Sequence, residues 1–149
     1  RMLFGEEPIS VVCNLKIDPE LNVDTKADIF LLYSHGKTAF ISAAFGAYFQ
    51  STYNVWGSKS FLSMKRAYAL PKDMETSIFL DRDDKINEIK IKPADHFKLA
   101  LEDFCKEILN KKNSEKNFES DFLAQARVLE AARLSNKEKR IVNLSEFSF

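Results

Sequence analysis

The residues best suited to catalysis or metal binding are few in this sequence and lie far apart. Of the two histidines, His35 precedes a glycine in a predicted turn and His96 lies in the first turn of a predicted helix. Neither has a second metal ligand at a suitable spacing, so we interpret both as surface residues. The two cysteines, Cys13 and Cys105, form no C-x-x-C pair, and we interpret them as buried free thiols.

Phosphate-binding loops require patterns that this sequence lacks. Its four glycines, Gly5, Gly36, Gly46 and Gly57, are each about ten residues or more from the next, so neither G-x-G-x-x-G nor a P-loop can be written. The stretch GSKS at 57–60 is interpreted as a turn between strands. No serine stands in a G-x-S-x-G setting, which excludes hydrolases of the nucleophile-elbow type. We therefore expect no catalytic, cofactor-binding or metal-binding residue in this chain.

Polar side chains on predicted strands are the remaining candidates for a binding site. Asn14, Lys16 and Arg66 could line a pocket for a small substrate, because strand residues are held more rigidly than loop residues. The alternative is that Asn14 and Lys16 only occupy the wetter face of a sheet or a contact between subunits. The acidic cluster at 81–84 (DRDD) contains an arginine, and it is predicted to be a solvated turn rather than a metal site.

Alternation of apolar and polar residues predicts the strands that would position these side chains. Residues 9–17 alternate with period two, which is typical of a strand with one buried face. A central strand is predicted over 27–34, followed by a tight turn at His35 and Gly36 and a partner strand over 37–45. Further strands are predicted over 48–56, 61–68, 76–80 and 86–91. Because short turns connect them, the sheet should be mainly antiparallel.

Two helices are predicted after Pro93. The first begins at Ala94 and carries apolar residues at helical spacing: Phe97, Leu101, Phe104 and Ile108. A charged link is expected over 110–117, and Ser120 is the predicted N-cap of the second helix. The buried face of that helix is predicted to consist of Phe122, Ala126, Leu129 and Ala132. A short closing strand is expected over 141–144.

Strands followed by helices are typical of the α+β class. We predict an open, mainly antiparallel β-sheet with two C-terminal helices packed on one face. The strands at 27–34 and 37–45 are apolar on both sides, more than two helices can cover. An exposed apolar face of this kind usually binds a partner, so we expect the other face to be the interface of a homo-oligomer.

Composition excludes several functional classes. The 149 residues suffice for about one domain. The 22 basic and 22 acidic residues cancel, so the chain lacks the basic surface that a nucleic-acid partner requires. No apolar run is long enough for a membrane span and no signal-peptide pattern is present, so we expect no membrane partner and a cytoplasmic location.

The order of the segments resembles the C-terminal domain of the Gfo/Idh/MocA family, which is named for glucose-fructose oxidoreductase, inositol dehydrogenase and rhizopine catabolism. The first stretch resembles the link between the catalytic helix and the first sheet strand of that family: RMLFGEEPISVVCNLKI. Later stretches that match in sequence and order are HGKTAF, YNVWGSKSFLSMKRAY, HFKLALEDFCKEI and DFLAQARVLEAARLS. Together these motifs cover nearly all of the chain.

The resemblance implies a two-domain oxidoreductase that depends on NAD or NADP and acts on a sugar, a nucleotide sugar or a related polyol. Residues 1–149 would be its C-terminal domain for substrate binding and oligomerisation, and the Rossmann domain would be absent from this chain. In the family, a lysine in an E-K-P motif, and an aspartate and a histidine on the helix just before the position of Arg1, serve proton transfer. None of these motifs is present here, so the chain alone is expected to be inactive and without bound cofactor.

The alternative is a stand-alone, non-catalytic binding or dimerisation module. Arg1 occupies the position of an initiator methionine, and Met2 to Phe4 are typical of the last turn of a helix that Gly5 ends. Both features are expected for a domain that belongs to a longer protein.

Overall fold

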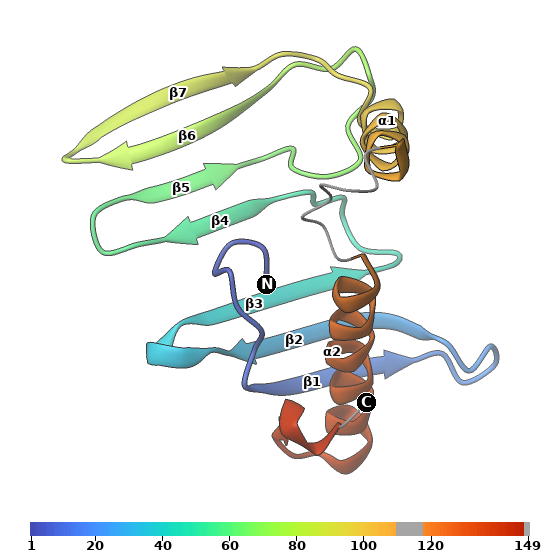
Figure 1. Cartoon of the computed structure of the whole chain (residues 1–149). Helices are drawn as coiled ribbons and strands as arrows, with labels where there is room; N and C mark the ends of the chain where they lie inside the picture. Colours follow the sequence, from blue (N-terminus) through green and yellow to red (C-terminus); the bar gives the residue numbers. More distant parts are fainter. Residues whose placement is uncertain (110–117, 148–149) are drawn as a thin grey trace. The chain divides into compact units, whose positions relative to one another are not determined.

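The computed structural model describes residues 1–109 and 118–147, so the predicted charged link at 110–117 lies outside the described residues. The strands form two four-stranded sheets in which every ladder is antiparallel, and two helices follow the seventh strand (Figure 1). This arrangement confirms the predicted α+β class. The hydrogen bonds divide the strands between two sheets, where the sequence indicated one. The chain accordingly separates into two compact units.

The first unit contains the sheet with strand order β3-β2-β1-β8. Its strands are β1 (Ser10–Ile17), β2 (Asp24–Leu32), β3 (Thr38–Ala44) and β8 (Val142–Asn143). The turn between β2 and β3 places His35 at φ 55° and Gly36 at φ 72°. Glycine is suited to this left-handed conformation because it has no Cβ, and the predicted tight turn is confirmed.

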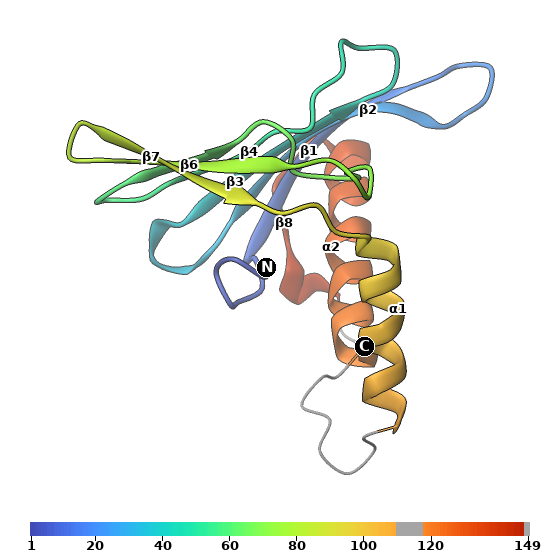
Figure 2. The same ribbon diagram turned by 90° about the horizontal axis from the view of Figure 1, so that it is seen from above.

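The core of the first unit lies between β1 and the helix α2 (Phe118–Glu138), which Figure 2 shows against one face of the sheet. Val11 and Val142 are fully buried there, and Ala131 packs against them without leaving any exposed surface. The alternation predicted over residues 9–17 is confirmed, because Val11 and Cys13 face the helix and Val12 and Asn14 face away.

The predicted buried face of α2 is correct for Ala132 and wrong for Phe122 and Leu129. The buried residues are Val128, Ala131, Ala132 and Ser135. Phe122 and Leu129 are instead exposed. The small alanines allow the helix to approach β1 closely, and this closeness decides which of two apolar phases is buried. Ser120 lies inside the first turn and is not the N-cap, because α2 begins earlier, at Phe118.

The second unit contains the sheet with strand order β4-β5-β6-β7 and the helix α1. Its elements are β4 (Tyr53–Trp56), β5 (Phe61–Met64), β6 (Thr76–Arg82), β7 (Lys85–Ile91) and α1 (His96–Leu109). The stretch GSKS is a turn, in which Gly57 N donates to Ser60 O over 3.0 Å. Asp83 and Asp84 form the turn between β6 and β7, as expected.

The apolar stripe of α1 has no buried side chain. Phe97 and Leu101 both remain exposed in this chain. Cys105 is exposed as well, so the prediction of a buried thiol is correct for Cys13 and wrong for Cys105. Among the described residues, neither helix is long and apolar enough to cross a membrane.

Candidate functional site

Asn14 and Lys16 lie on the face of the β1–β2–β3 sheet that points away from α2, here called the open face. Both side chains are exposed. Cys13, the residue before Asn14, points to the opposite face and is covered by the helix. The register places Asn14 opposite Asp28 and Lys16 opposite Lys26. The side chains that share the open face are Val12, Asn14, Lys16, Lys26, Asp28, Phe30, Phe40 and Ser42.

A polar row crosses the open face from β1 to β3 through Asn14, Asp28 and Ser42, which the register aligns. Ser42 Oγ donates to Asp28 Oδ1 over 2.7 Å, and Lys26 Nζ lies 2.9 Å from Asp28 Oδ2. The hydrogen bond from Ser42 and the ammonium of Lys26 lower the pKa of Asp28 below its ordinary value. Asp28 is therefore a fixed carboxylate at neutral pH.

Asn14 is the member of this row that is free to bind a ligand. Within residues 1–109 and 118–147, its side chain makes no hydrogen bond to the protein. A side-chain amide offers two donors and one acceptor, which suits a sugar hydroxyl.

An apolar row lies next to the polar row, one step further along the ladder. Val12, Phe30 and Phe40 are aligned across the three strands, and 67% of Phe40 is exposed. A flat apolar row beside hydrogen-bonding groups can contact the ring of a ligand or the sheet of another subunit.

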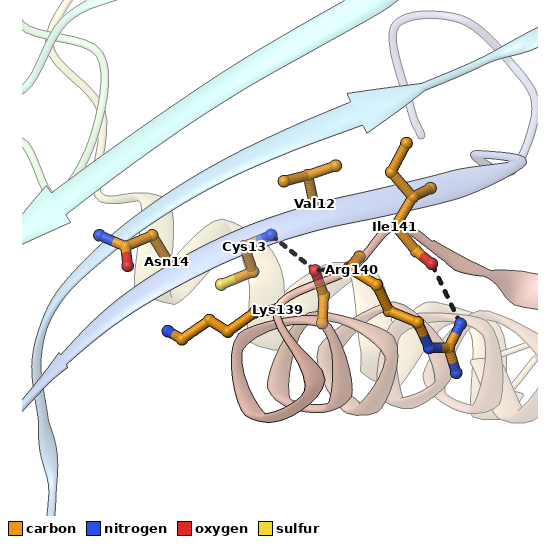
Figure 3. Close-up of a pocket in the computed structure, with 7 residues that line it drawn as sticks. Val12, Cys13, Asn14, Lys139, Arg140 and Ile141 are labelled. Carbon is orange, nitrogen blue, oxygen red and sulfur yellow. Dashed lines mark hydrogen bonds between the residues drawn. The ribbon is translucent and has the colours of Figure 1, made fainter.

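A hollow of about 400 Å³ lies where the unpaired edge of β1 meets the C-terminal end of α2 (Figure 3). Ser135 Oγ accepts a hydrogen bond from Cys13 N over 3.0 Å and donates one to Arg140 O over 2.6 Å. Asn136 Oδ1 accepts from Leu15 N over 2.8 Å. Ser135 and Asn136 thus accept the backbone hydrogen bonds that a neighbouring strand would otherwise accept from β1.

The basic groups that line this hollow already have partners. Lys139 Nζ donates to Asn136 Oδ1 over 3.0 Å, and Arg140 forms ion pairs with Glu138 and Glu146. Figure 3 shows Arg140 turned toward the carbonyl of Ile141 and away from Lys139. Both basic side chains are thus held by partners within the first unit, and the predicted site residue Asn14 also lines this hollow. The sequence did not indicate the roles of Ser135 and Asn136, which stand in a charged run at a helix end.

Burial raises the pKa of the Cys13 thiol above its ordinary value. The thiolate is the reactive form of cysteine, so a raised pKa keeps this thiol unreactive near neutral pH. Cys13 therefore contributes to packing and not to chemistry.

Arg66, the third predicted site residue, belongs to the second unit and is not gathered with Asn14 and Lys16 in one unit. Its guanidinium lies over the ring of Phe49, 4.8 Å from the ring centroid. Thr76 Oγ1 donates to Arg66 O over 3.0 Å, and Ser51 Oγ accepts from Tyr68 N over 3.0 Å. The backbone around Arg66 is thereby held in place. A stacked guanidinium keeps its donors available for an anion.

A second hollow, of about 460 Å³, lies beside the first turn of α2. Arg1 Nε lies 2.7 Å from Glu7 Oε2, and another guanidinium nitrogen of Arg1 lies 3.5 Å from Asp121 Oδ1. Basic and acidic side chains both line the hollow. Among the described residues, no group of three or more His, Cys, Asp or Glu side chains could hold a metal ion.

No protein-family model matches the chain. Over 89 residues it is 25% identical to dTDP-3,4-didehydro-2,6-dideoxy-alpha-D-glucose 3-reductase of Saccharopolyspora spinosa, covering 60% of this chain and 27% of that protein. Over 109 residues it is 25% identical to the uncharacterized oxidoreductase ORF334 of Rhizobium meliloti, covering 70% of this chain and 33% of that protein. The chain thus spans about a third or less of the curated relatives that it matches.

Solved structures resemble the chain over most of its length. KijD10, a 3-ketoreductase from Actinomadura kijaniata in complex with NADP and TDP-benzene, superimposes with a TM-score of 0.81 at 20% identity, covering 90% of this chain and 41% of KijD10. The chain shares its fold with part of KijD10, and at the level of the fold this agrees with the resemblance to the Gfo/Idh/MocA oxidoreductases.

Proposed function

We propose that the chain is the C-terminal, substrate-binding domain of an NADP- or NAD-dependent oxidoreductase that acts on a nucleotide sugar. The observation that carries this proposal is the superposition of 90% of the chain on KijD10, a ketoreductase solved with NADP and a TDP compound. The match to a dTDP-sugar 3-reductase supports the same substrate class. A keto sugar linked to dTDP is the substrate that both relatives suggest.

The residues of this chain do not fit the cofactor. Every strand ladder in the described residues is antiparallel, and the glycines stand singly, so no crevice of a parallel sheet exists for a dinucleotide. The cofactor and the proton-transferring groups would therefore belong to the rest of the protein. This chain would bind and orient the sugar nucleotide.

Asn14, Lys16 and Arg66 are the residues that we propose for substrate binding. Asn14 and Lys16 share the open face with a fixed carboxylate, Asp28, and can bind hydroxyl groups. Arg66 is stacked on Phe49, an arrangement suited to a phosphate oxygen. The alternative that Asn14 and Lys16 occupy only a subunit contact remains a competing use of the same face.

The test uses the natural full-length protein that carries this chain. Oxidation of NADPH is followed by absorbance with a dTDP-linked 3-keto sugar, with the free keto sugar and with dTDP alone as controls. We expect turnover only with the dTDP-linked sugar. Tight cofactor binding without turnover of any keto sugar would contradict the proposed substrate class, and absence of cofactor binding would contradict the proposal as a whole.

Substitution of Arg66 tests its assignment in the same assay. Arg66→Met should raise KM for the dTDP-linked sugar about tenfold or more, since a charged hydrogen bond contributes roughly 1.5–3 kcal/mol. Arg82→Met is a matched control, because Arg82 is an exposed arginine at the end of β6. An unchanged KM for Arg66→Met would show that Arg66 does not bind the substrate.

The open face would also join two copies of the protein. Val12, Phe30 and Phe40 form the apolar row that a second sheet can cover. We further propose a cytoplasmic location, which agrees with free cysteines and a soluble cofactor. No nucleic-acid or membrane partner is proposed. The alternative, a stand-alone binding or dimerisation module, is disfavoured because the chain matches only part of larger oxidoreductases.

A further inference from the structure

The segment between β5 and β6 that contains Arg66 is held by two hydroxyl side chains. Ser51 Oγ donates to Tyr68 O over 3.1 Å and accepts from Tyr68 N over 3.0 Å. Thr76 Oγ1 donates to Arg66 O over 3.0 Å. The carbonyl of Ser51 also accepts from Ala67 N over 2.7 Å. Ser51 and Thr76 thus hold the backbone of every residue from Arg66 to Tyr68.

These hydrogen bonds join distant parts of the second unit. Ser51 is 17 positions from Tyr68, and Thr76, the first residue of β6, is 10 positions from Arg66. All four residues belong to the second unit, so these contacts are internal to it. Ser51 and Thr76 are both buried, and a backbone group that loses a buried partner is costly to leave unpaired. The two hydroxyl groups therefore restrain the segment strongly.

The backbone directly after the segment is strained. Ala69 adopts a left-handed conformation with φ 50°. In this conformation the Cβ of an L-residue crowds the following carbonyl oxygen, so the conformation persists only where the surrounding structure holds it. Without the bonds from Ser51 to Tyr68, the chain at Ala69 would relax and displace the residues next to it. The hydroxyl bonds thus keep the segment in a conformation that it would not adopt alone.

Ser51 also sets the distance between Arg66 and the ring on which it is stacked. The guanidinium of Arg66 lies 4.8 Å from the centroid of the Phe49 ring. Phe49 stands two residues before Ser51, and Ser51 forms an isolated bridge with Arg66. The same residue therefore fastens the stretch that carries the ring to the segment that carries the guanidinium. A planar guanidinium binds phosphate oxygens well only when its orientation is fixed.

We propose that Ser51 and Thr76 are positioning residues for substrate binding. They hold the backbone of residues 66–68, so that the guanidinium of Arg66 is ordered for the phosphate groups of the sugar nucleotide before the substrate binds. The inference rests on the proposed function, in which Arg66 binds that phosphate. Neither hydroxyl group has to touch the substrate, because its contribution is to lower the cost of ordering Arg66 on binding.

Calorimetric titration of the natural full-length protein with dTDP tests the proposal. Ser51→Ala removes one hydroxyl, and Thr76→Val removes the other with little change of shape. Each should raise Kd for dTDP about 3- to 10-fold, the range expected when one side chain has to be ordered on binding. Thr76→Ser keeps the hydroxyl and should bind dTDP like the wild type. An unchanged Kd in Ser51→Ala and in Thr76→Val would overturn the proposal.

Ser77→Ala is the matched control. Ser77 Oγ donates to Glu88 Oε1 over 2.6 Å across β6 and β7, and this bond does not involve the segment around Arg66. The variant loses a hydroxyl bond from the same sheet, so it reports general loosening of the second unit. Its Kd for dTDP should equal that of the wild type. Equal weakening in Ser77→Ala and Ser51→Ala would show general destabilisation and overturn the positioning role.

A double-mutant cycle shows whether Ser51 acts through Arg66. In a protein that already carries Arg66→Met, the further change Ser51→Ala should not weaken dTDP binding any more, since the side chain that Ser51 positions is gone. Additive losses in the double variant would show that Ser51 acts on another part of the site and would overturn the proposal.

Steady-state kinetics separates this inference from the proposed function. With the dTDP-linked 3-keto sugar, Ser51→Ala should raise KM for the sugar and leave kcat and KM for NADPH unchanged, because the lost contribution is to binding alone. A protein that reduces this sugar with the same KM in wild type, Ser51→Ala and Thr76→Val would retain the proposed function and lose the positioning residues. A protein whose variants bind dTDP more weakly, and which reduces no keto sugar, would retain the positioning residues and have a different reaction.

Discussion

Ser135 joins three parts of the first unit through one hydroxyl group. It is 2% exposed, and it bonds to Cys13 N in β1 and to Arg140 O after the end of α2. A hydroxyl can serve both as acceptor and as donor, and Ser135 uses both capacities. Removing it would leave the buried N–H of Cys13 and the carbonyl of Arg140 without these hydrogen bonds.

Ser135→Ala should therefore lower the free energy of unfolding by about 1–3 kcal/mol. Ser58→Ala, in the exposed turn between β4 and β5, is the matched control and should have little effect. Urea denaturation of both variants gives the comparison. A Ser135→Ala variant as stable as the control would show that the hydrogen bonds of Ser135 add no net stability.

Arg140 and Glu146 form the ion pair with the largest electrostatic effect on a carboxylate. Arg140 Nη2 lies 2.7 Å from Glu146 Oε2, and Asn143 N donates to Glu146 Oε1 over 2.9 Å. The bond from Arg140, followed by that from Asn143, lowers the pKa of Glu146 from 4.5 to about 2. A lowered folded-state pKa means that the pair stabilises the fold above the unfolded-state pKa, and that this contribution is lost as the pH falls toward 2.

Arg140→Gln should return the pKa of Glu146 toward 4.5, because the largest cause of its shift is removed. The measurement is an NMR titration of the Glu146 carboxyl carbon. Lys137→Gln is the control, since Lys137 is exposed and does not pair with Glu146. If the pKa of Glu146 stayed at about 2 in Arg140→Gln, the hydrogen bond from Asn143 alone would account for the lowered pKa.

The three strands β1, β2 and β3 form an element with two different faces. The face toward α2 is packed along β1 and part of β2, while the open face combines the polar row of Asn14, Asp28 and Ser42 with an apolar row beside it. Period-two alternation produces this division, because neighbouring residues in each strand point to opposite sides. A partner on the open face would bury the apolar row.

Phe40→Glu should therefore reduce self-association of the full-length protein. A charge at the centre of an apolar contact carries a desolvation penalty of several kcal/mol, which corresponds to a loss of at least about 100-fold in affinity. Val23→Glu, in the turn before β2, is the matched control because Val23 is also half-exposed and lies off the open face. Analytical ultracentrifugation measures both, and an unchanged dimer in Phe40→Glu would place the subunit contact elsewhere.

At the scale of the whole molecule, the two units differ in how much they bury. Among residues 1–109 and 118–147, all nine buried apolar residues lie in the first unit, and the buried residues of the second unit are Ser51 and Thr76. Burial of apolar surface is the main source of stability, so the first unit should be the more stable.

In the 149-residue chain, amides of β5 and β6 should exchange faster than amides of β1 and β2 bonded within the ladder. Hydrogen exchange measured across the chain checks this expectation, and β1–β2 pairs serve as the internal reference. Equal protection in both units would indicate that the half-buried face of β4 to β6 stabilises the second unit more than its burial suggests.

Much of the fold followed from local sequence patterns. Alternation over residues 9–17 indicated β1, and the pair His35 and Gly36 indicated the turn that allows β2 and β3 to lie side by side. Both signals act between near neighbours in the chain, which is why they can be recognised without the structure. The candidate site was harder to predict from the sequence. Asn14 and Arg66 were chosen for their residue type and strand position, and the partners of Arg66 lie up to 17 residues away in the sequence.

The sequence by itself determined the strands, the main turns, the α+β class and the absence of any glycine-rich loop, since these depend on residue type and short-range spacing. Only the tertiary structure decided which face of α2 is buried and that Ser135 and Asn136 bond to the edge of β1. Ser135 is 122 positions from its partner Cys13, and contacts over such separations form only when the whole chain packs. The same packing decides which side of α2 is buried. The side with the small residues Ala131 and Ala132 fits closer to the sheet than the side with Phe122 and Leu129.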